Sequence, residues 1–242
     1  MIACNSALGW PSPAEAPEGA GSAGRVELLQ HLLRISGLHV RRQDKLLILD
    51  SPGHSDLAEA ISVAERGGLV IAVKSFEAFA TALGLTPTCR LEPPRDGWLF
   101  SFCSGQSVRL RTLHTSVSYA GLELEEILAD EAGRPLWLYR RRGIGGVLFV
   151  GTALIDDVCR YRQGDPARAL ERPGEPLWGI AGERPNYLFE GQLPDDASKY
   201  ERQADYWVFA LAETIGRKLR RPLTPVLPHA APGAIVFTGD DD

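Results

Sequence analysis

The sequence predicts an α/β protein in which helices flank a mostly parallel sheet. Two apolar runs, KLLILD at 45–50 and LVIAVKS at 69–75, have the continuous hydrophobicity of buried central strands. Each run is followed by a helical pattern, over about 55–66 and 76–84. Alternation of strand and helix is typical of a parallel sheet, because each helix carries the chain back to the start of the next strand.

Further elements surround this unit. A helix is predicted over 25–37, where leucines recur at helical spacing and Gly37 ends the pattern. Residues 88–142 contain short strand-like runs separated by turns and are interpreted as a β-rich insertion. The turn GIGG at 143–146 leads into an apolar strand at 147–151, and a helix follows over about 154–162.

Near the C-terminal end, DYWVFALAETIGRKLRR predicts an amphipathic helix with a basic last turn, which suits the helix dipole. Its predicted apolar face consists of Tyr206, Phe209, Ala210, Ile215 and Leu219. The chain divides into an N-terminal strand with a flexible connector, an α/β domain, a long connection, a helix with a proline-rich linker, and a separate terminal strand. These segments are residues 1–24, 25–163, 164–203, 204–232 and 233–242.

Composition excludes several classes of protein. The 242 residues carry a net charge of -5, so no overall basic field favours nucleic acid or an anionic membrane as partner. No apolar stretch is long enough to span a bilayer, and the N-terminus lacks the pattern of a signal peptide, which predicts a cytoplasmic protein. The sequence leaves open whether the chain forms a homo-oligomer.

The cysteines do not suggest a metal site. They are widely scattered, contain no C-x-x-C pair and are expected to be free thiols: Cys4, Cys89, Cys103 and Cys159. The histidines His31, His39 and His114 have no partner at metal-ligand spacing and are interpreted as core or surface residues. The basic runs at 140–142 and 217–221 are interpreted as solvated ends of a strand and a helix.

Two turns at the carboxyl ends of strands are candidates for chemistry. In AVKSFEAF a nucleophile elbow would need small residues around Ser75, but Lys74 and Phe76 flank it, so Ser75 is interpreted as a helix N-cap. In SPGHSD, His54 and Asp56 could line a pocket, but the preferred interpretation is a turn in which Ser55 or Asp56 caps the next helix. Asp156 and Asp157 near the start of a helix are interpreted as compensating its dipole.

The order of these motifs resembles a known class of domains. LLILDSP, DLAEAISVAERGGLVIAV, FATALG and PLWLYRRRGIGGVLFVGTAL, within about residues 25–162, resemble class I glutamine amidotransferase-like domains in the degenerate form of ThuA-like and trimerisation-type modules. The resemblance implies a flavodoxin-like α/β fold. Active amidotransferases carry a cysteine at the elbow, where this chain has Lys74 and Ser75. The resemblance therefore implies a non-catalytic scaffold or binding domain.

The final residues GAIVFTGDDD resemble a second family, the NodB-homology polysaccharide deacetylases, whose first motif is T-F-D-D-G. The matching positions are Thr238, Asp240 and Asp241, whereas Gly239 replaces Phe and Asp242 replaces Gly. The resemblance implies that Asp240 is a general base and that Asp241 binds a divalent metal such as zinc. Because the H-x-x-x-H motif that supplies the other ligands is missing, neither a bound metal nor activity is expected in this chain. A solvated acidic terminus is the alternative.

Two functions follow from these observations. The first is a non-catalytic amidotransferase-like accessory domain of a metal-dependent polysaccharide deacetylase, with residues 233–242 as the first strand of a truncated deacetylase-like domain and carbohydrate as partner. The second is a stand-alone α/β module that binds a ligand or a protein. An α/β hydrolase that uses Ser75 or His54 is disfavoured by the residues at the elbow.

Overall fold

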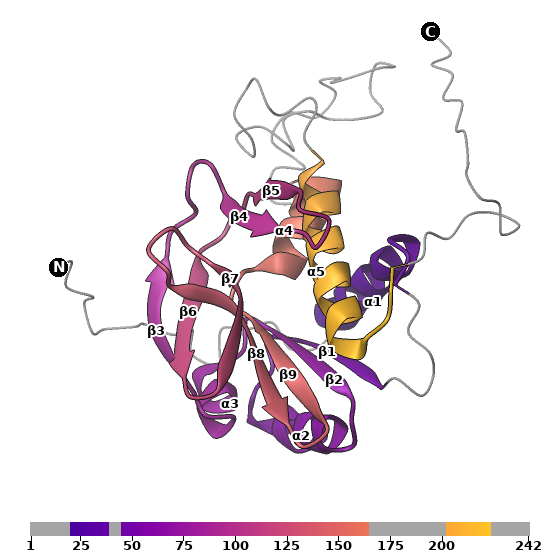
Figure 1. Cartoon of the computed structure of the whole chain (residues 1–242), viewed down its shortest axis with the longest axis vertical. Coiled ribbons are helices and arrows are strands. Elements are labelled where there is room, and N and C mark those ends of the chain that lie inside the picture. Colours follow the sequence, from indigo (N-terminus) through magenta and orange to yellow (C-terminus); the bar gives the residue numbers. More distant parts are fainter. Residues whose placement is uncertain (1–19, 39–44, 165–201, 224–242) are drawn as a thin grey trace, which may run out of the picture.

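The computed structural model describes residues 20–38, 45–164 and 202–223. A five-stranded sheet in the order β1-β2-β9-β8-β7 forms the centre of this part of the chain (Figure 1). Its strands are β1 (Leu46–Asp50), β2 (Leu69–Val73), β9 (Gly145–Val150), β8 (Pro135–Arg142) and β7 (Leu124–Ala129). The predicted α/β class is therefore confirmed.

The sheet is mixed in direction. β1, β2 and β9 are parallel neighbours, in a register that places Ile48 beside Ile71 and Ile71 beside Leu148. β8 and β7 run antiparallel to their neighbours. The turn Gly143–Ile144 joins β8 to β9, and a two-residue turn can connect only antiparallel strands. The predicted parallel arrangement is thus present in β1, β2 and β9, whereas β8 and β7 depart from it.

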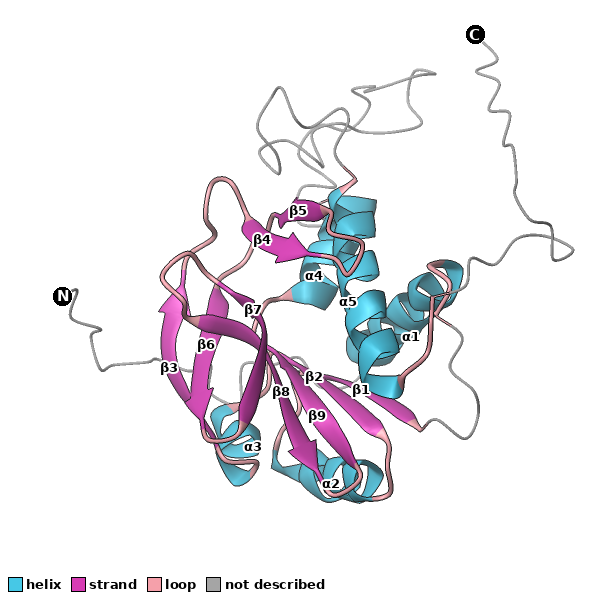
Figure 2. Cartoon of the chain, in the orientation of Figure 1, coloured by secondary structure: helices cyan, strands magenta, loops and turns pink. Residues whose placement is uncertain are grey.

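Helices cover both faces of the sheet (Figure 2). One face carries α2 (Leu57–Glu65) and α3 (Glu77–Ala82), and the other carries α1 (Ala20–Ile35), α4 (Leu154–Gln163) and α5 (Gln203–Leu219). Alternate residues of β2 show this division: Leu69, Ile71 and Val73 pack with α1, α4 and α5, whereas Val70 and Ala72 pack with α2 and α3. All five are buried, which explains the unbroken apolar run in the sequence.

The predicted β-rich insertion is present between α3 and β7. It contains two small antiparallel sheets, one of β3 (Leu85–Leu91) with β6 (Ser116–Gly121) and one of β4 (Trp98–Ser101) with β5 (Ser107–Leu110). Trp98, Phe100 and Leu110 are buried in the same core as α5. The Phe100 ring lies 6.1 Å from the ring of Trp137 on β8, so the insertion extends the core of the main sheet.

Helix α5 lies outside the predicted 25–163 segment but packs into the same core. Trp207 is fully buried, and its ring centroid lies 5.8 Å from that of Trp137. The predicted apolar face of this helix was partly wrong, because Phe209 is 44% exposed. The buried arc instead follows Ala204, Trp207, Val208, Leu211 and Ile215, residues that recur at helical spacing toward α1, α4 and the sheet.

Several predicted features lie outside the described residues. They are the N-terminal strand, the run LHVRR apart from Leu38, most of the 164–203 connection, the proline-rich linker and the strand that ends at Asp242. Cys4 and His39 also lie there. Within the part of the chain that the structure describes, no helix is long and apolar enough to cross a membrane.

Candidate functional site at the carboxyl edge of the parallel strands

Two non-glycine residues with left-handed backbone follow the parallel strands β1 and β2. They are Ser51, with φ 53°, and Lys74, with φ 49°. Their amides remain in the sheet pattern, since Ser51 N–H donates to the carbonyl of Val73 and Lys74 N–H donates to that of Val150. Strained residues of this kind cluster at functional sites, and open α/β sheets bind ligands at this edge. The backbone therefore marks the carboxyl edge of the sheet as the candidate site.

The strained residue of the β2–α3 turn is Lys74, so the elbow lies one residue before Ser75. The N-cap interpretation of Ser75 was wrong, because Phe76 occupies the N-cap position of α3. Ser75 is 1% exposed, and its Oγ lies 3.3 Å from the hydroxyl of Tyr119. Burial raises the pKa of Tyr119 to about 12. Ser75 is thus part of a buried neutral pair.

An ion cluster covers this edge and links four elements. Arg25 of α1 bonds Asp50 at the end of β1, with 2.8 Å between Nη2 and Oδ2, and also bonds Asp156 in the first turn of α4. Lys74 Nζ lies 2.8 Å from Asp156 Oδ2. The side chains of Arg25 and Lys74 are 41% and 40% exposed, whereas those of Asp50 and Asp156 are 4% and 22% exposed. The cations therefore face solvent and the carboxylates lie beneath them.

The pKa values of the two carboxylates in the ion cluster are shifted in opposite directions. Burial raises the pKa of Asp50, although Arg25 opposes this effect. Burial also acts to raise the pKa of Asp156, but the hydrogen bond and charge of Lys74, followed by the charge of Arg25, outweigh it and leave the pKa lowered. The two cations therefore favour the ionised form of Asp156, whereas burial disfavours the ionised form of Asp50.

Asp157 forms a second, fully buried node beside the ion cluster. Its carboxylate accepts hydrogen bonds from Thr112 Oγ1 at 2.5 Å and from Leu113 N–H at 2.9 Å, and it lies 2.7 Å from His114 Nδ1. The predicted position of Asp156 and Asp157 near the start of a helix is confirmed, since both lie in the first turn of α4, and both also bond groups outside this helix. His114, interpreted as a core or surface residue, has a carboxylate partner.

The remaining predicted site residues do not join this edge. His54 is exposed on the 3-10 turn η3 (His54–Asp56). Asp56 holds the N-cap position of α2, as preferred, but its carboxylate accepts the N–H of Gly53 at 2.8 Å and makes no cap bond to the helix. Asp240 and Asp241 lie outside the described residues.

The described residues do not assemble a metal site or an activated nucleophile. Among residues 20–38, 45–164 and 202–223, no three His, Cys, Asp or Glu side chains could hold a metal ion together. The acidic pair Asp50 and Asp156 is already bridged by Arg25. Cys159 of α4 is a free thiol whose pKa is raised by burial, despite the opposing charge of Arg25. A thiol of this kind is a weak nucleophile at neutral pH.

We expect Asp156→Asn to lower the free energy of unfolding by about 1 kcal/mol at pH 7, since it removes both ion pairs. The pKa of Asp156 is lowered in the folded state from its ordinary 3.8. Its stabilisation is therefore present above that ordinary value and is lost as the pH falls through the folded pKa. The difference between wild type and Asp156→Asn should shrink below about pH 4 in urea titrations. A difference that stays constant down to pH 2 contradicts the ionic role.

Asp50 also contributes to the pH dependence of stability, so wild type must be compared with variants. The raised pKa of Asp50 acts in the opposite direction, because its contribution is present below the unfolded pKa and is lost as the pH rises through the folded one. The wild-type curve alone mixes the two effects. The difference in unfolding free energy between wild type and Asp156→Asn isolates the contribution of Asp156. The corresponding difference between wild type and Asp50→Asn should change with pH in the opposite direction.

No protein-family model and no curated protein sequence matches this chain. Solved structures match it only distantly. An exo-β-1,4-mannosidase from Opitutaceae bacterium strain TAV5 is 18% identical over 62% of this chain, with a TM-score of 0.45. A β-galactosidase from Bacillus circulans sp. alkalophilus is 12% identical over 63% of this chain, with a TM-score of 0.42. The matches cover 31% and 28% of those longer chains.

A third solved structure is of similar length to this chain. It is a cytoplasmic protein from Salmonella typhimurium LT2, 13% identical over 83% of this chain and 89% of its own, with a TM-score of 0.42. At these identities and TM-scores the similarities assign neither a family nor an activity. The function must be argued from the residues at the carboxyl edge.

Proposed function

We propose that the described α/β unit is a non-catalytic accessory or ligand-binding domain with a flavodoxin-like, amidotransferase-like architecture. The observation that carries this proposal is Lys74. It occupies the strained residue of the strand–turn–helix, where a nucleophile elbow would hold its nucleophile, and its ammonium group is bonded to Asp156. The carboxylate of Asp156 holds this ammonium group in an ion pair, so the side chain is not presented as a nucleophile.

The neighbouring groups support the same proposal. Ser75 is buried against Tyr119, so a substrate cannot reach its hydroxyl without displacing the core. Cys159 lies near the ion cluster, but burial keeps its thiol protonated. Arg25 and Lys74 together offset the charges of Asp50 and Asp156, an arrangement that stabilises the edge of the sheet. The residues at the edge thus form a structural bridge in place of catalytic machinery.

We further propose that the parent protein is a metal-dependent polysaccharide deacetylase. The observation that favours this is the apolar run Ala-Ile-Val-Phe directly before Thr238, Asp240 and Asp241. Asp240 would act as base, and Asp241 would be one ligand of a divalent ion such as zinc. Such an ion supplies a water of lowered pKa and polarises the acetamide carbonyl. The alternative is a stand-alone binding module in which residues 233–242 complete the domain's own sheet.

The reading frame after codon 242 separates these two alternatives. An open frame that encodes H-x-x-x-H within some tens of residues supports the deacetylase. A stop codon at that point, together with a stable monodisperse product, supports the stand-alone module. The non-catalytic role of the α/β unit itself is independent of this outcome.

We expect the purified chain to show no glutaminase activity and no hydrolysis of p-nitrophenyl acetate above a protein-free control, because no described group is an activated nucleophile. Rates are to be measured at saturating substrate beside Lys74→Met and Cys159→Ser. Hydrolysis that disappears in either variant contradicts the proposal. A trace rate that is equal in wild type and both variants reflects a contaminant and leaves the expectation in place.

A further inference from the structure

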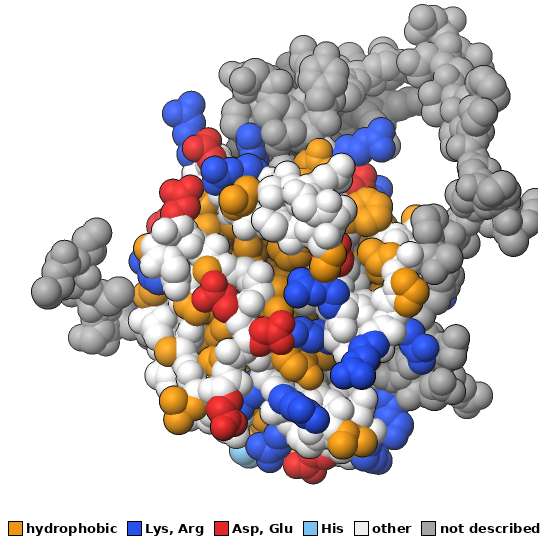
Figure 3. Space-filling model, in the orientation of Figure 1, with side chains coloured by type: hydrophobic (Ala, Val, Ile, Leu, Met, Phe, Trp, Pro, Cys, Tyr) orange, Lys and Arg blue, Asp and Glu red, His pale blue; other side chains and the backbone are white. Residues whose placement is uncertain are grey.

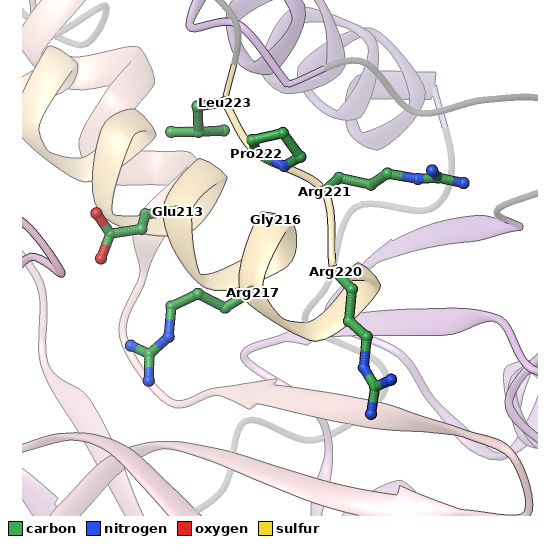
Figure 4. Close-up of a pocket in the computed structure, with 7 residues that line it drawn as sticks. All are labelled: Glu213, Gly216, Arg217, Arg220, Arg221, Pro222 and Leu223. Carbon is green, nitrogen blue, oxygen red and sulfur yellow. The ribbon is translucent and has the colours of Figure 1, made fainter.

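A hollow of about 360 Å³ lies at the C-terminal end of α5, away from the carboxyl edge of the sheet. Figure 4 shows the seven residues that line it. They are Glu213, Gly216, Arg217, Arg220, Arg221, Pro222 and Leu223. The volume falls within the usual range for small-molecule sites. Three arginines and two apolar residues in one hollow suggest a ligand with an anionic and an apolar part.

The chain reversal after α5 builds this hollow. Arg220 takes a left-handed conformation, with φ 54° and ψ 44°, and the N–H of Arg221 then donates to the carbonyl of Gly216 at 2.7 Å. Leu223 is thereby brought back against the helix at Gly216. A Cβ at position 216 would lie 2.7 Å from the carbonyl oxygen of Arg221, which is too close for any side chain. Glycine is therefore required at the floor of the hollow.

The hollow carries an excess of positive charge. Arg217 and Arg220 are exposed, and their guanidinium groups have no ion-pair partner within the described ranges. In Figure 4 both side chains extend from the same side of the helix, opposite Pro222 and Leu223. Glu213 accepts the N–H of Cys103 at 2.8 Å. Figure 3 shows further Lys and Arg side chains on this face of the molecule.

Nearby Lys218 is used differently. Its ammonium group bonds Glu125 and lies 4.3 Å from the centre of the Tyr139 ring, and its side chain is 11% exposed. It therefore anchors α5 to β7 and β8 and is not available to a ligand. Arg217 and Arg220 differ from Lys218 because their side chains are exposed and their guanidinium groups have no ion-pair partner among the described residues.

Arg220 is an unfavourable choice for its backbone conformation. A left-handed residue at a helix end is usually glycine, because a Cβ there adds steric strain. An arginine that keeps this strain, while its guanidinium makes no hydrogen bond or ion pair with the described residues, is explained if that guanidinium serves a ligand. Arg217 lies one helical turn earlier and extends from the same side of the helix.

We propose that this hollow binds the phosphate group of a small phosphomonoester. Arg217 and Arg220 offer planar forks that match phosphate oxygens, and the apolar part of the ligand extends across the hollow to Pro222 and Leu223, which line its other side. A small ligand fits better than a nucleic acid, because the chain as a whole has a net charge of -5. This inference does not depend on the proposed function of the α/β unit.

The test is an NMR titration of the wild-type chain with inorganic phosphate and with phenyl phosphate, at ionic strength held constant with sodium chloride. We expect saturable shifts of the Gly216 and Arg221 amide signals, with half-saturation at about millimolar phosphate. Phenyl phosphate should bind several-fold more tightly, because its ring removes apolar surface from water. Arg217→Gln and Arg220→Gly should each weaken binding about tenfold. Arg95→Gln, an exposed arginine in the turn before β4, is the matched control and should bind like wild type.

The thermal stability of Arg220→Gly shows whether a loss of binding in this variant results from unfolding. Glycine relieves the left-handed strain, so the midpoint of thermal unfolding should rise by about 2–4 °C while binding is lost. A loss of binding in this variant therefore cannot be attributed to unfolding. Shifts with phosphate no larger than those with chloride overturn the proposal, as does unchanged affinity in both Arg217→Gln and Arg220→Gly.

Discussion

Trp207→Ala is expected to lower the free energy of unfolding by about 3–5 kcal/mol, the range for truncating a large aromatic side chain in a core. Trp207 is fully buried between α5 and the sheet, with its ring 5.8 Å from that of Trp137. Its indole N–H donates to the carbonyl of Arg111 at 2.6 Å. Alanine would leave a cavity beside Trp137 and remove the shorter of two hydrogen bonds to that carbonyl, which would keep only the Tyr161 hydroxyl at 3.3 Å, so a polar cost adds to the packing cost. Urea unfolding followed by far-ultraviolet circular dichroism measures the loss.

Phe209→Ala on the same helix is the matched control. Phe209 is 44% exposed, so its truncation should cost less than about 1 kcal/mol. A variant of intermediate size, Trp207→Phe, should fall between the two because it keeps much of the ring volume but loses the N–H. If Phe209→Ala costs as much as Trp207→Ala, the assignment of the buried arc of α5 is wrong.

The parallel half of the sheet could be predicted because its signal is local. The runs at 45–50 and 69–75 are apolar at nearly every position, since strands covered on both faces have no solvent-facing residues. Gly67 directly follows the predicted helix at 55–66, and its positive φ of 86° is the left-handed conformation that commonly ends a helix. The direction of β8 is encoded in the short turn at 143–146, because so short a turn imposes antiparallel pairing on the two strands that it joins.

The buried face of α5 was harder to predict because apolar residues surround the helix. Trp207, Val208, Phe209, Ala210 and Leu211 are consecutive, so several arcs of similar hydrophobicity could be drawn through the sequence. The structure selects Trp207 and Leu211 because they face Trp137 and the neighbouring helices. That choice depends on tertiary packing, which periodicity alone does not contain.

The ion cluster at the carboxyl edge had almost no local signal. Arg25 and Asp156, which bond each other, are 131 positions apart, and Lys74 and Asp156 are 82 apart. The available clue was positional: Asp50 ends β1 and Lys74 follows β2, and the carboxyl ends of these neighbouring parallel strands meet at one edge. The sequence located the strand-to-helix turn correctly but interpreted Ser75 as the helix N-cap, a position that Phe76 holds in the structure. The backbone geometry places Lys74 at the strained residue of this turn.

Asp157→Ala is expected to lower the free energy of unfolding by about 3–5 kcal/mol, as for removal of one partner from a buried charged network. The carboxylate is fully buried, and it bonds Thr112 Oγ1, Leu113 N–H and His114 Nδ1. Alanine would leave the Thr112 hydroxyl with its bond to the carbonyl of His114, but the Leu113 amide would have no acceptor in its place. It would also remove a negative charge from the first turn of α4.

Two variants separate the carboxylate from its surroundings. Asp157→Asn keeps the shape and can keep an acceptor oxygen for Leu113 N–H, but its amide nitrogen then replaces the acceptor of Thr112 Oγ1, so an intermediate loss is expected. His114→Ala removes a single, one-third exposed partner and should cost about 1 kcal/mol. Hydrogen exchange of the Leu113 amide reports the network directly, because its protection depends on Asp157 Oδ1. Wild-type protection of that amide in Asp157→Ala, with an unfolding free energy within 1 kcal/mol of wild type, would show that β5 and β6 hold this segment without the carboxylate.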